Sequence, residues 1–103
     1  MEVKSVTAVS KEHDAAIFPD TKTSRGVKHI ETLIELKDKG YNAILFFCVQ
    51  RNGVTQMRTA PEFDREYAYA LELAMKKGVD VIAYSCHISL EGITLDHSIP
   101  IVV

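Results

Sequence analysis

Two strand-length apolar runs separated by helical patterns constrain the fold more than any other feature of this sequence. The runs span 42–50 and 79–87, and each is continuous rather than alternating. Such runs are typical of strands buried on both faces of a parallel sheet. We expect a further strand over 3–9 and a short final strand over 99–103, where Pro100 favours an edge position.

Helical periodicity occupies the two gaps between these strands. A first helix is expected to begin at Thr23 or Ser24, either of which can cap it, and to end before Gly40. A second helix should begin after Asp64 and end at Gly78. The apolar positions that recur at helical spacing are Val27, Ile30, Leu33 and Ile34, then Tyr67, Ala70, Leu71, Ala74 and Met75. The resulting β-α-β-α-β order predicts parallel strands joined by right-handed crossovers.

Length, charge and hydrophobicity narrow the classes of protein to which this chain can belong. The chain has 103 residues, which suits one domain, and a net charge of −2, which does not by itself indicate a nucleic-acid binder. All twelve Lys and Arg residues lie at or before Lys77, so an anion-binding face must come from the first three quarters of the chain. With no membrane-length apolar run and no signal-peptide core, we expect a cytoplasmic protein. Cys48 and Cys86 are expected to be reduced core residues.

The first residues hold the main candidate site. In a strand, Glu2 and Lys4 lie on one face while Val3 lies on the other. This pair is either a surface ion pair or half of a metal-dependent phosphodiesterase site. In the second case the carboxylate helps to hold Mg²⁺ and the ammonium stabilises charge on the phosphate. Metal-assisted hydrolysis would need at least one more acidic ligand.

One apparent match to the nuclease motif PD…(D/E)xK is rejected on geometry. Pro19 and Asp20 are followed at a plausible interval by Glu35 and Lys37. Both of the latter fall in the first helical pattern, where residues two apart point to nearly opposite sides. They cannot address one phosphate together, and solvated helix surface is the expected role.

Basic residues gather at the start of the first predicted helix. Arg25, Lys28 and His29 occupy positions i, i+3 and i+4, and Lys22 precedes them. A positive patch beside free backbone N–H groups suits phosphate, although a solvated helix start explains the same pattern.

Other polar residues remain ambiguous. Gln50 and Arg51 end the central strand, where they either contact a ligand or close a turn. Three histidines without metal-ligand spacing are expected to be structural or at the surface: His13, His87 and His97.

Several segments together resemble the sugar fermentation stimulation protein A family. They are EVKSVT at 2–7, FPDxxTxRGxKH at 18–29 and FxVQR at 47–51, followed by Asp64-x-x-Tyr67 and KGVxVxAY at 77–84. The segments occur in the family's order and cover nearly the whole chain, which is similar to the C-terminal portion of that family.

The resemblance implies a restriction-endonuclease-like α/β fold, with a mixed sheet, flanking helices and the N-terminal strands absent. Residues 1–103 would form a single nuclease-like domain, without the family's N-terminal OB-like domain. Glu2 and Lys4 would then be the catalytic second half of the PD-(D/E)xK motif. The first catalytic Asp would not be in this chain, and Asp20 is the candidate substitute that would hold Mg²⁺ together with Glu2.

The resemblance also implies DNA binding and regulation of sugar (maltose) genes. Two alternatives stay open: a Mg²⁺-dependent DNA phosphodiesterase that uses Glu2 and Lys4, or a non-catalytic oligomerisation fragment. We expect a homodimer or larger assembly formed through the free edge of the first strand. The candidate DNA contacts are Lys22, Arg25, Lys28, His29, Gln50 and Arg51.

Overall fold

The computed structural model describes residues 1–10, 15–51 and 53–102. Its elements run in the order β1 (Glu2–Val6), β2 (Ala15–Phe18), α1 (Ser24–Asp38), β3 (Ile44–Val49), β4 (Gln56–Thr59), α2 (Arg65–Lys76), β5 (Asp80–Ser89), β6 (Gly92–Ile99) and β7 (Ile101–Val102). Two residues with a sequence-based prediction lie outside the described residues: His13, expected to be structural or at the surface, and Val103, the end of the predicted final strand. Among the described residues, no helix is both long and apolar enough to cross a membrane.

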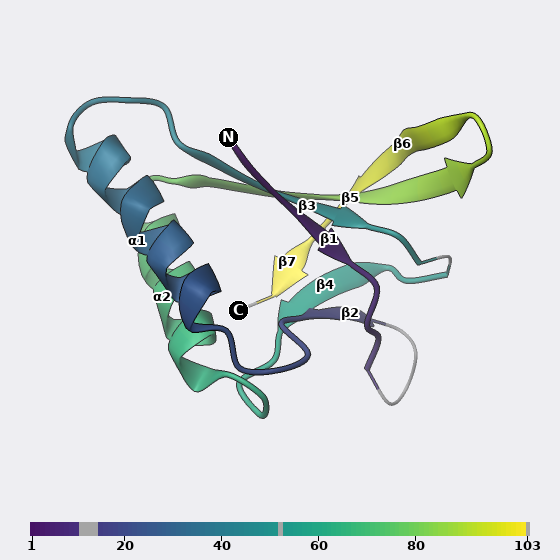
Figure 1. The fold of residues 1–103 in the computed structure, drawn as a ribbon, viewed down its shortest axis with the longest axis horizontal. Coiled ribbons are helices and arrows are strands. Elements are labelled where there is room, and N and C mark those ends of the chain that lie inside the picture. The colour runs from purple at the N-terminus through teal and green to yellow at the C-terminus, as the bar shows by residue number, and fades with distance from the viewer. Residues whose placement is uncertain (11–14, 52, 103) are drawn as a thin grey trace.

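The larger sheet has the strand order β1-β3-β5-β6. β1, β3 and β5 are parallel, as the sequence predicts, with Glu2 beside Leu45 and Val6 beside Val49. β6 returns antiparallel to β5 as a hairpin (Figure 1). The predicted first strand over 3–9 ends earlier, at Val6. β1 lies at one end of the sheet, in agreement with the expected edge position.

A second sheet, with the order β2-β4-β7, was not predicted as a sheet. Its strands have 4, 4 and 2 residues, so they are too short to show a clear periodicity. Neither β2 nor β4 was predicted as a strand. Among the described residues β7 pairs only with β4, which agrees with the predicted edge position of the final strand.

The main core lies on one face of the larger sheet. Figure 1 shows both helices and the smaller sheet on this side. Leu45, Phe47 and Val49 of β3 are fully buried there, whereas Phe46 on the opposite face is only half-buried. The prediction that this strand is buried on both faces therefore holds only in part: Cys48 is buried on the second face, but Ile44 and Phe46 are half-buried there, because the helices and the smaller sheet pack on the other side.

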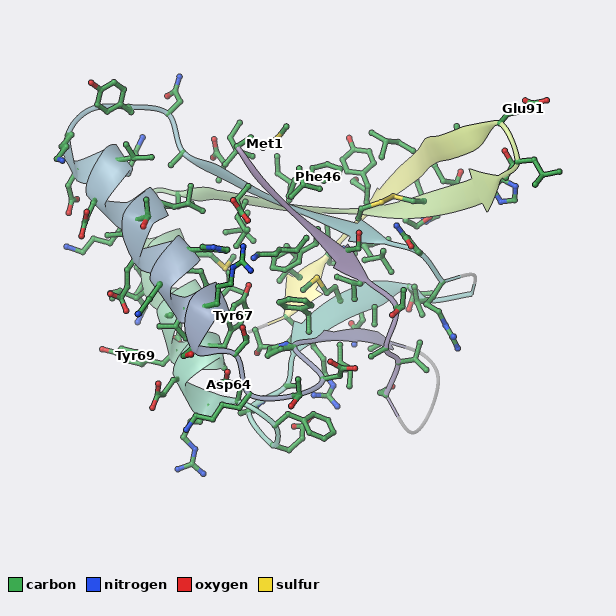
Figure 2. The ribbon with its side chains drawn as sticks, viewed as in Figure 1. Met1, Phe46, Asp64, Tyr67, Tyr69 and Glu91 are labelled. Atoms are coloured by element: carbon green, nitrogen blue, oxygen red, sulfur yellow. A yellow bond between two sulfur atoms is a disulfide. The ribbon has the colours of Figure 1, made fainter. Side chains whose placement is uncertain are left out.

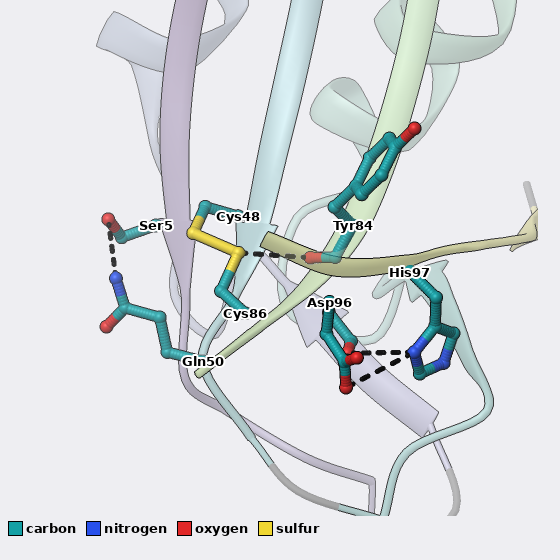
Figure 3. The surroundings of a disulfide bond; sticks show 8 residues. Ser5, Cys48, Gln50, Tyr84, Cys86, Asp96 and His97 are labelled. Atoms are coloured by element: carbon teal, nitrogen blue, oxygen red, sulfur yellow. Dashed lines mark hydrogen bonds and ion pairs between the residues drawn. A yellow bond between two sulfur atoms is a disulfide. The ribbon is translucent and has the colours of Figure 1, made fainter. Parts of the chain in front are cut away.

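The two cysteines form a disulfide in this structure, contrary to the expectation of two reduced residues (Figure 3). Cys48 lies on β3 and Cys86 on β5, with 6.1 Å between their Cα atoms. They are 38 residues apart in the sequence and become neighbours only through strand pairing. Their proximity could not be read from their spacing.

Candidate functional site

The candidate site lies where β1 faces α1. Glu2 and Lys4 extend from the same side of β1 as Val6, which is buried in the core. Lys4 Nζ lies 3.3 Å from Glu2 Oε1 and 2.8 Å from His29 Nδ1. His29 Nδ1 in turn lies 3.3 Å from Glu2 Oε1. The structure therefore joins the predicted Glu2–Lys4 pair to one histidine of the predicted basic patch.

Lys4 is the central donor of this cluster. Its ammonium has three N–H groups, so it can donate to His29 Nδ1 and to Glu2 at the same time. The Lys4 side chain is 16% exposed and that of Glu2 is 36% exposed, so the cluster sits at the boundary between core and solvent. An ion pair at such a boundary contributes little to stability. For function, the informative property of this cluster is that it holds opposite charges close together.

Helix α1 extends the cluster along β1. The two elements run in opposite directions (Figure 1). Met1, Glu2 and His29 line a cleft of about 210 Å³ together with Thr32, Leu33 and Leu36 of α1. Arg25 lies one helical turn before His29, on the same side of α1.

Three further cations stand near the start of α1: Lys22, Arg25 and Lys28 are all exposed. Within the described part of the chain, none of them makes an ion pair, and the first turn of α1 holds no acidic residue. Basic charge at a helix start favours an anion. Two N–H groups there are already used, since Asp64 Oδ2 accepts the Thr23 N–H and Thr23 Oγ1 accepts the Gly26 N–H. The predicted basic patch is thus present, without ion-pair partners among the described residues.

Tyr67 is a further candidate site residue, which the sequence pattern assigns only to the apolar side of the second helix. Its side chain is completely buried, and its hydroxyl is the one buried side-chain polar atom without a hydrogen-bond partner among the described residues. Burial, followed by the Glu2 and Asp64 carboxylates, raises the pKa of Tyr67. Figure 2 shows Tyr67 on the inner side of α2, whereas Tyr69 points outward. The sequence feature that could have indicated Tyr67 is a hydroxyl-bearing residue at a helical position where the pattern is otherwise apolar.

Asp64 connects the starts of the two helices. Its Oδ1 accepts from the Tyr67 backbone N–H at 3.0 Å and caps α2. Its Oδ2 accepts from the backbone N–H of Thr23, the cap of α1, at 2.7 Å. An added Cβ at Gly26 would lie 2.9 Å from Tyr67 Cε2, so the glycine allows the ring to pass close to α1. These contacts fix the position of the Tyr67 ring against the start of α1.

Other predicted residues lie elsewhere. Gln50 donates through its backbone N–H to Val6 O at 2.8 Å, and its side chain donates to Ser5 Oγ at 3.5 Å (Figure 3). Arg51 follows it, so both stand at the carboxyl end of β1 and β3, whereas Glu2 stands at the amino end. Roughly 13 Å of strand separate these ends at 3.3 Å per residue.

The rejected nuclease motif lies on α1 as predicted, with Glu35 exposed and Lys37 half-buried. His87 is on β5 and exposed, and His97 on β6 pairs with its neighbour Asp96 at 3.4 Å (Figure 3). These residues remain outside the cluster.

The residues that the structure describes do not complete a metal site. They contain no group of three or more His, Cys, Asp and Glu side chains that could hold a metal ion. Asp20 is exposed in the loop between β2 and α1. Glu2 already engages Lys4 and His29 through one oxygen. A divalent cation prefers several oxygen ligands, so these residues do not fit it on their own.

Comparison with known proteins gives the family. Residues 1–92 match the family model described as "Sugar fermentation stimulation protein RE domain". The chain belongs to the sugar fermentation stimulation protein family. A sugar fermentation stimulation protein homolog from Pseudoalteromonas atlantica is 43% identical over 103 residues, and one from Pelagibacter ubique is 44% identical over 102 residues. These alignments cover 100% and 99% of this chain.

A solved structure supports the same assignment. Pyrococcus furiosus SfsA, determined in complex with Ca²⁺, has a TM-score of 0.84 to this chain at 28% identity. The match covers 98% of this chain and 44% of the archaeal one. The chain likewise spans 43% of the Pseudoalteromonas relative and 44% of the Pelagibacter relative. It therefore corresponds to less than half the length of these SfsA relatives.

Proposed function

We propose that this chain binds DNA through the face formed by Glu2, Lys4, His29 and the start of α1, and that it serves in a regulator of sugar-metabolism genes, those for maltose included. The main support for the proposal is the cluster at β1 and α1. Exposed cations at the start of α1 adjoin this cluster and make no ion pair among the described residues. Lys and Arg that contact phosphates supply affinity without reading sequence.

The family supports the regulatory part of this proposal. Its model and relatives carry the description sugar fermentation stimulation. We also propose a cytoplasmic location, which is compatible with a DNA-associated role. We further propose that the mixed α/β fold is restriction-endonuclease-like and that residues 1–103 form one domain. The ExK strand paired in parallel with β3 supports this interpretation.

The decisive experiment measures the binding of a labelled DNA duplex by fluorescence anisotropy over a series of salt concentrations, with EDTA present. We expect affinity to fall as salt rises. Lys4→Ala and Arg25→Ala should each weaken binding and reduce the slope of log K against log salt by about one. Lys39→Ala is the matched control, because Lys39 is exposed at the opposite end of α1. Absence of binding at low salt, or an equal loss with Lys39→Ala, would contradict the proposal.

Metal-dependent DNA cleavage is the second candidate function. Glu2 and Lys4 lie on one face of β1, with 3.3 Å between Glu2 Oε1 and Lys4 Nζ. The ExK half of a nuclease site requires both side chains on one strand face. The SfsA of Pyrococcus furiosus was solved in complex with Ca²⁺, which supports testing this chain for divalent-ion binding. In this second candidate function, Glu2 is the carboxylate ligand and Mg²⁺ is the ion. Because the described residues do not complete a metal site, cleavage would depend on ligands that they do not supply. Plasmid nicking with Mg²⁺ or Mn²⁺ that Lys4→Ala abolishes would establish this function.

A further inference from the structure

Two complementary polar groups lie unused beside the proposed DNA-binding cluster. The Tyr67 hydroxyl is buried without an acceptor. Both close polar contacts of Glu2, with Lys4 and His29, use Oε1, and Oε2 makes no hydrogen bond or ion pair within the described ranges. A buried donor that lacks an acceptor is costly, and a phenylalanine would avoid that cost at this position. The hydroxyl therefore calls for a functional explanation.

Packing places the Tyr67 ring behind the cluster. The ring lies edge-on to Phe18, with centroids 5.3 Å apart, and Phe18 contacts Phe47 at 5.5 Å. Phe47 is the β3 partner of Lys4, so the two side chains extend from the same face of the sheet. On the other side, the ring passes Gly26 of α1, one turn before His29. Tyr67 is thus enclosed between Phe18 and α1, on the side of the sheet from which Lys4 extends.

The electrostatics agree with this placement. Glu2 is the charged group with the largest effect on Tyr67 after burial itself, and it helps to raise the pKa of the phenol. A phenol is protonated at neutral pH even at its usual pKa of about 10, so the hydroxyl is a hydrogen-bond donor there. A carboxylate is the strongest acceptor that such a donor can meet.

We propose that Glu2 exchanges partners when a phosphate group binds: the phosphate engages Lys4 and His29, and the released Glu2 carboxylate accepts the O–H of Tyr67. This inference rests on the proposed function, because it takes the bound group to be a phosphate of the DNA backbone. Tyr67 is a positioning residue that acts through Glu2.

The charges explain why Glu2 must move. Lys4 and His29 both lie 3.3 Å from Glu2 Oε1, so a phosphate that binds these two side chains arrives beside a carboxylate. Like charges in contact repel, and the repulsion grows as water is excluded. Glu2 is 36% exposed and has rotatable bonds, so it can turn, whereas Tyr67 is fixed by its packing. The buried hydroxyl stabilises the carboxylate in its new position.

The test is a double-mutant cycle on ligand binding with EDTA present. The parent, Tyr67→Phe, Glu2→Ala and the double variant are titrated with the DNA duplex and, separately, with inorganic phosphate detected by its effect on thermal unfolding. We expect Tyr67→Phe to weaken binding about fivefold in the parent and to have no effect once Glu2 is alanine. Because tyrosine carries no charge, the salt slope should not change. Tyr69→Phe, on the outer side of α2, is the matched control.

A spectroscopic measurement separates positioning from a structural role. The ¹³Cζ resonance of labelled Tyr67 should shift when phosphate is added to the parent and stay unchanged in Glu2→Ala. Additive effects in the cycle, or an equal shift in Glu2→Ala, would overturn the inference while leaving DNA binding intact. Phosphate binding with the expected coupling but without DNA binding would support the inference and contradict the proposed function. If neither ligand binds, both are wrong.

Discussion

At the scale of single residues, the buried hydroxyl of Tyr67 gives this protein its clearest chemical signature. Burial and two nearby carboxylates all disfavour the phenolate. The folded state therefore binds the phenolic proton more tightly than the unfolded chain does. This difference makes stability depend on pH in the alkaline range.

We predict that Tyr67→Phe removes part of the alkaline loss of stability. A group whose pKa is raised by folding contributes fully below its unfolded pKa, which is about 10 for tyrosine, and the contribution is lost as pH rises through the folded pKa. The free energy of unfolding of the parent should therefore fall above pH ~10 more steeply than that of Tyr67→Phe, by at most about 1.4 kcal/mol per pH unit. Urea unfolding at several pH values measures this, and equal slopes would show the prediction to be wrong.

At the scale of elements, the two helices are joined at their first turns. Asp64 caps α2 and also accepts the backbone N–H of the residue that caps α1. Gly26 and Tyr67 form the close contact between the helices just beyond these caps. Two predictions test this arrangement.

Gly26→Ala should destabilise the protein, although alanine normally stabilises a helix over glycine by about 1 kcal/mol. The new Cβ would lie 2.9 Å from both Tyr67 Cε2 and Thr23 Cγ2, closer than carbon atoms pack. Overpacking of this kind costs about 1–3 kcal/mol. The midpoint of urea unfolding reports the change. Glu35→Ala, at an exposed position of α1, is the control, and it should leave the midpoint nearly unchanged.

Asp64→Ala should cost about 3 kcal/mol of stability. The loss of a helix cap accounts for up to about 2 kcal/mol, and the Thr23 N–H also loses its acceptor. Thr23→Ala removes only the hydrogen bond that the Gly26 N–H donates to Thr23 Oγ1, and it should cost about 1 kcal/mol. Equal losses in the two variants, measured by thermal or urea unfolding, would show that Asp64 does not join the helices energetically.

At the scale of the whole molecule, the sequence predicted the parallel β1-β3-β5 core because long apolar runs and helical periodicity reflect burial directly. It also predicted the Glu2–Lys4 pair, since two residues on one strand face need no tertiary information. The smaller sheet, the Cys48–Cys86 pair and the approach of Tyr67 depend on contacts between distant segments. Short strands and a lone hydroxyl in an apolar pattern do not encode those contacts locally.

The free edge of β1 leads to the last prediction, a homodimer or larger assembly. Within the described residues, β1 pairs with β3 on one side only, and its Val3 is 54% exposed. An unpaired edge strand with an exposed apolar residue is a template for another strand, and charge on such an edge opposes pairing. Sedimentation velocity should show the parent as a dimer or larger species and Val3→Lys as a monomer. Val102→Lys is the control, because Val102 is 46% exposed on β7, at the edge of the other sheet, and should not change the assembly. A parent that stays monomeric across a wide concentration range would contradict assembly through β1. Dissociation by both variants would instead indicate a general effect of charge.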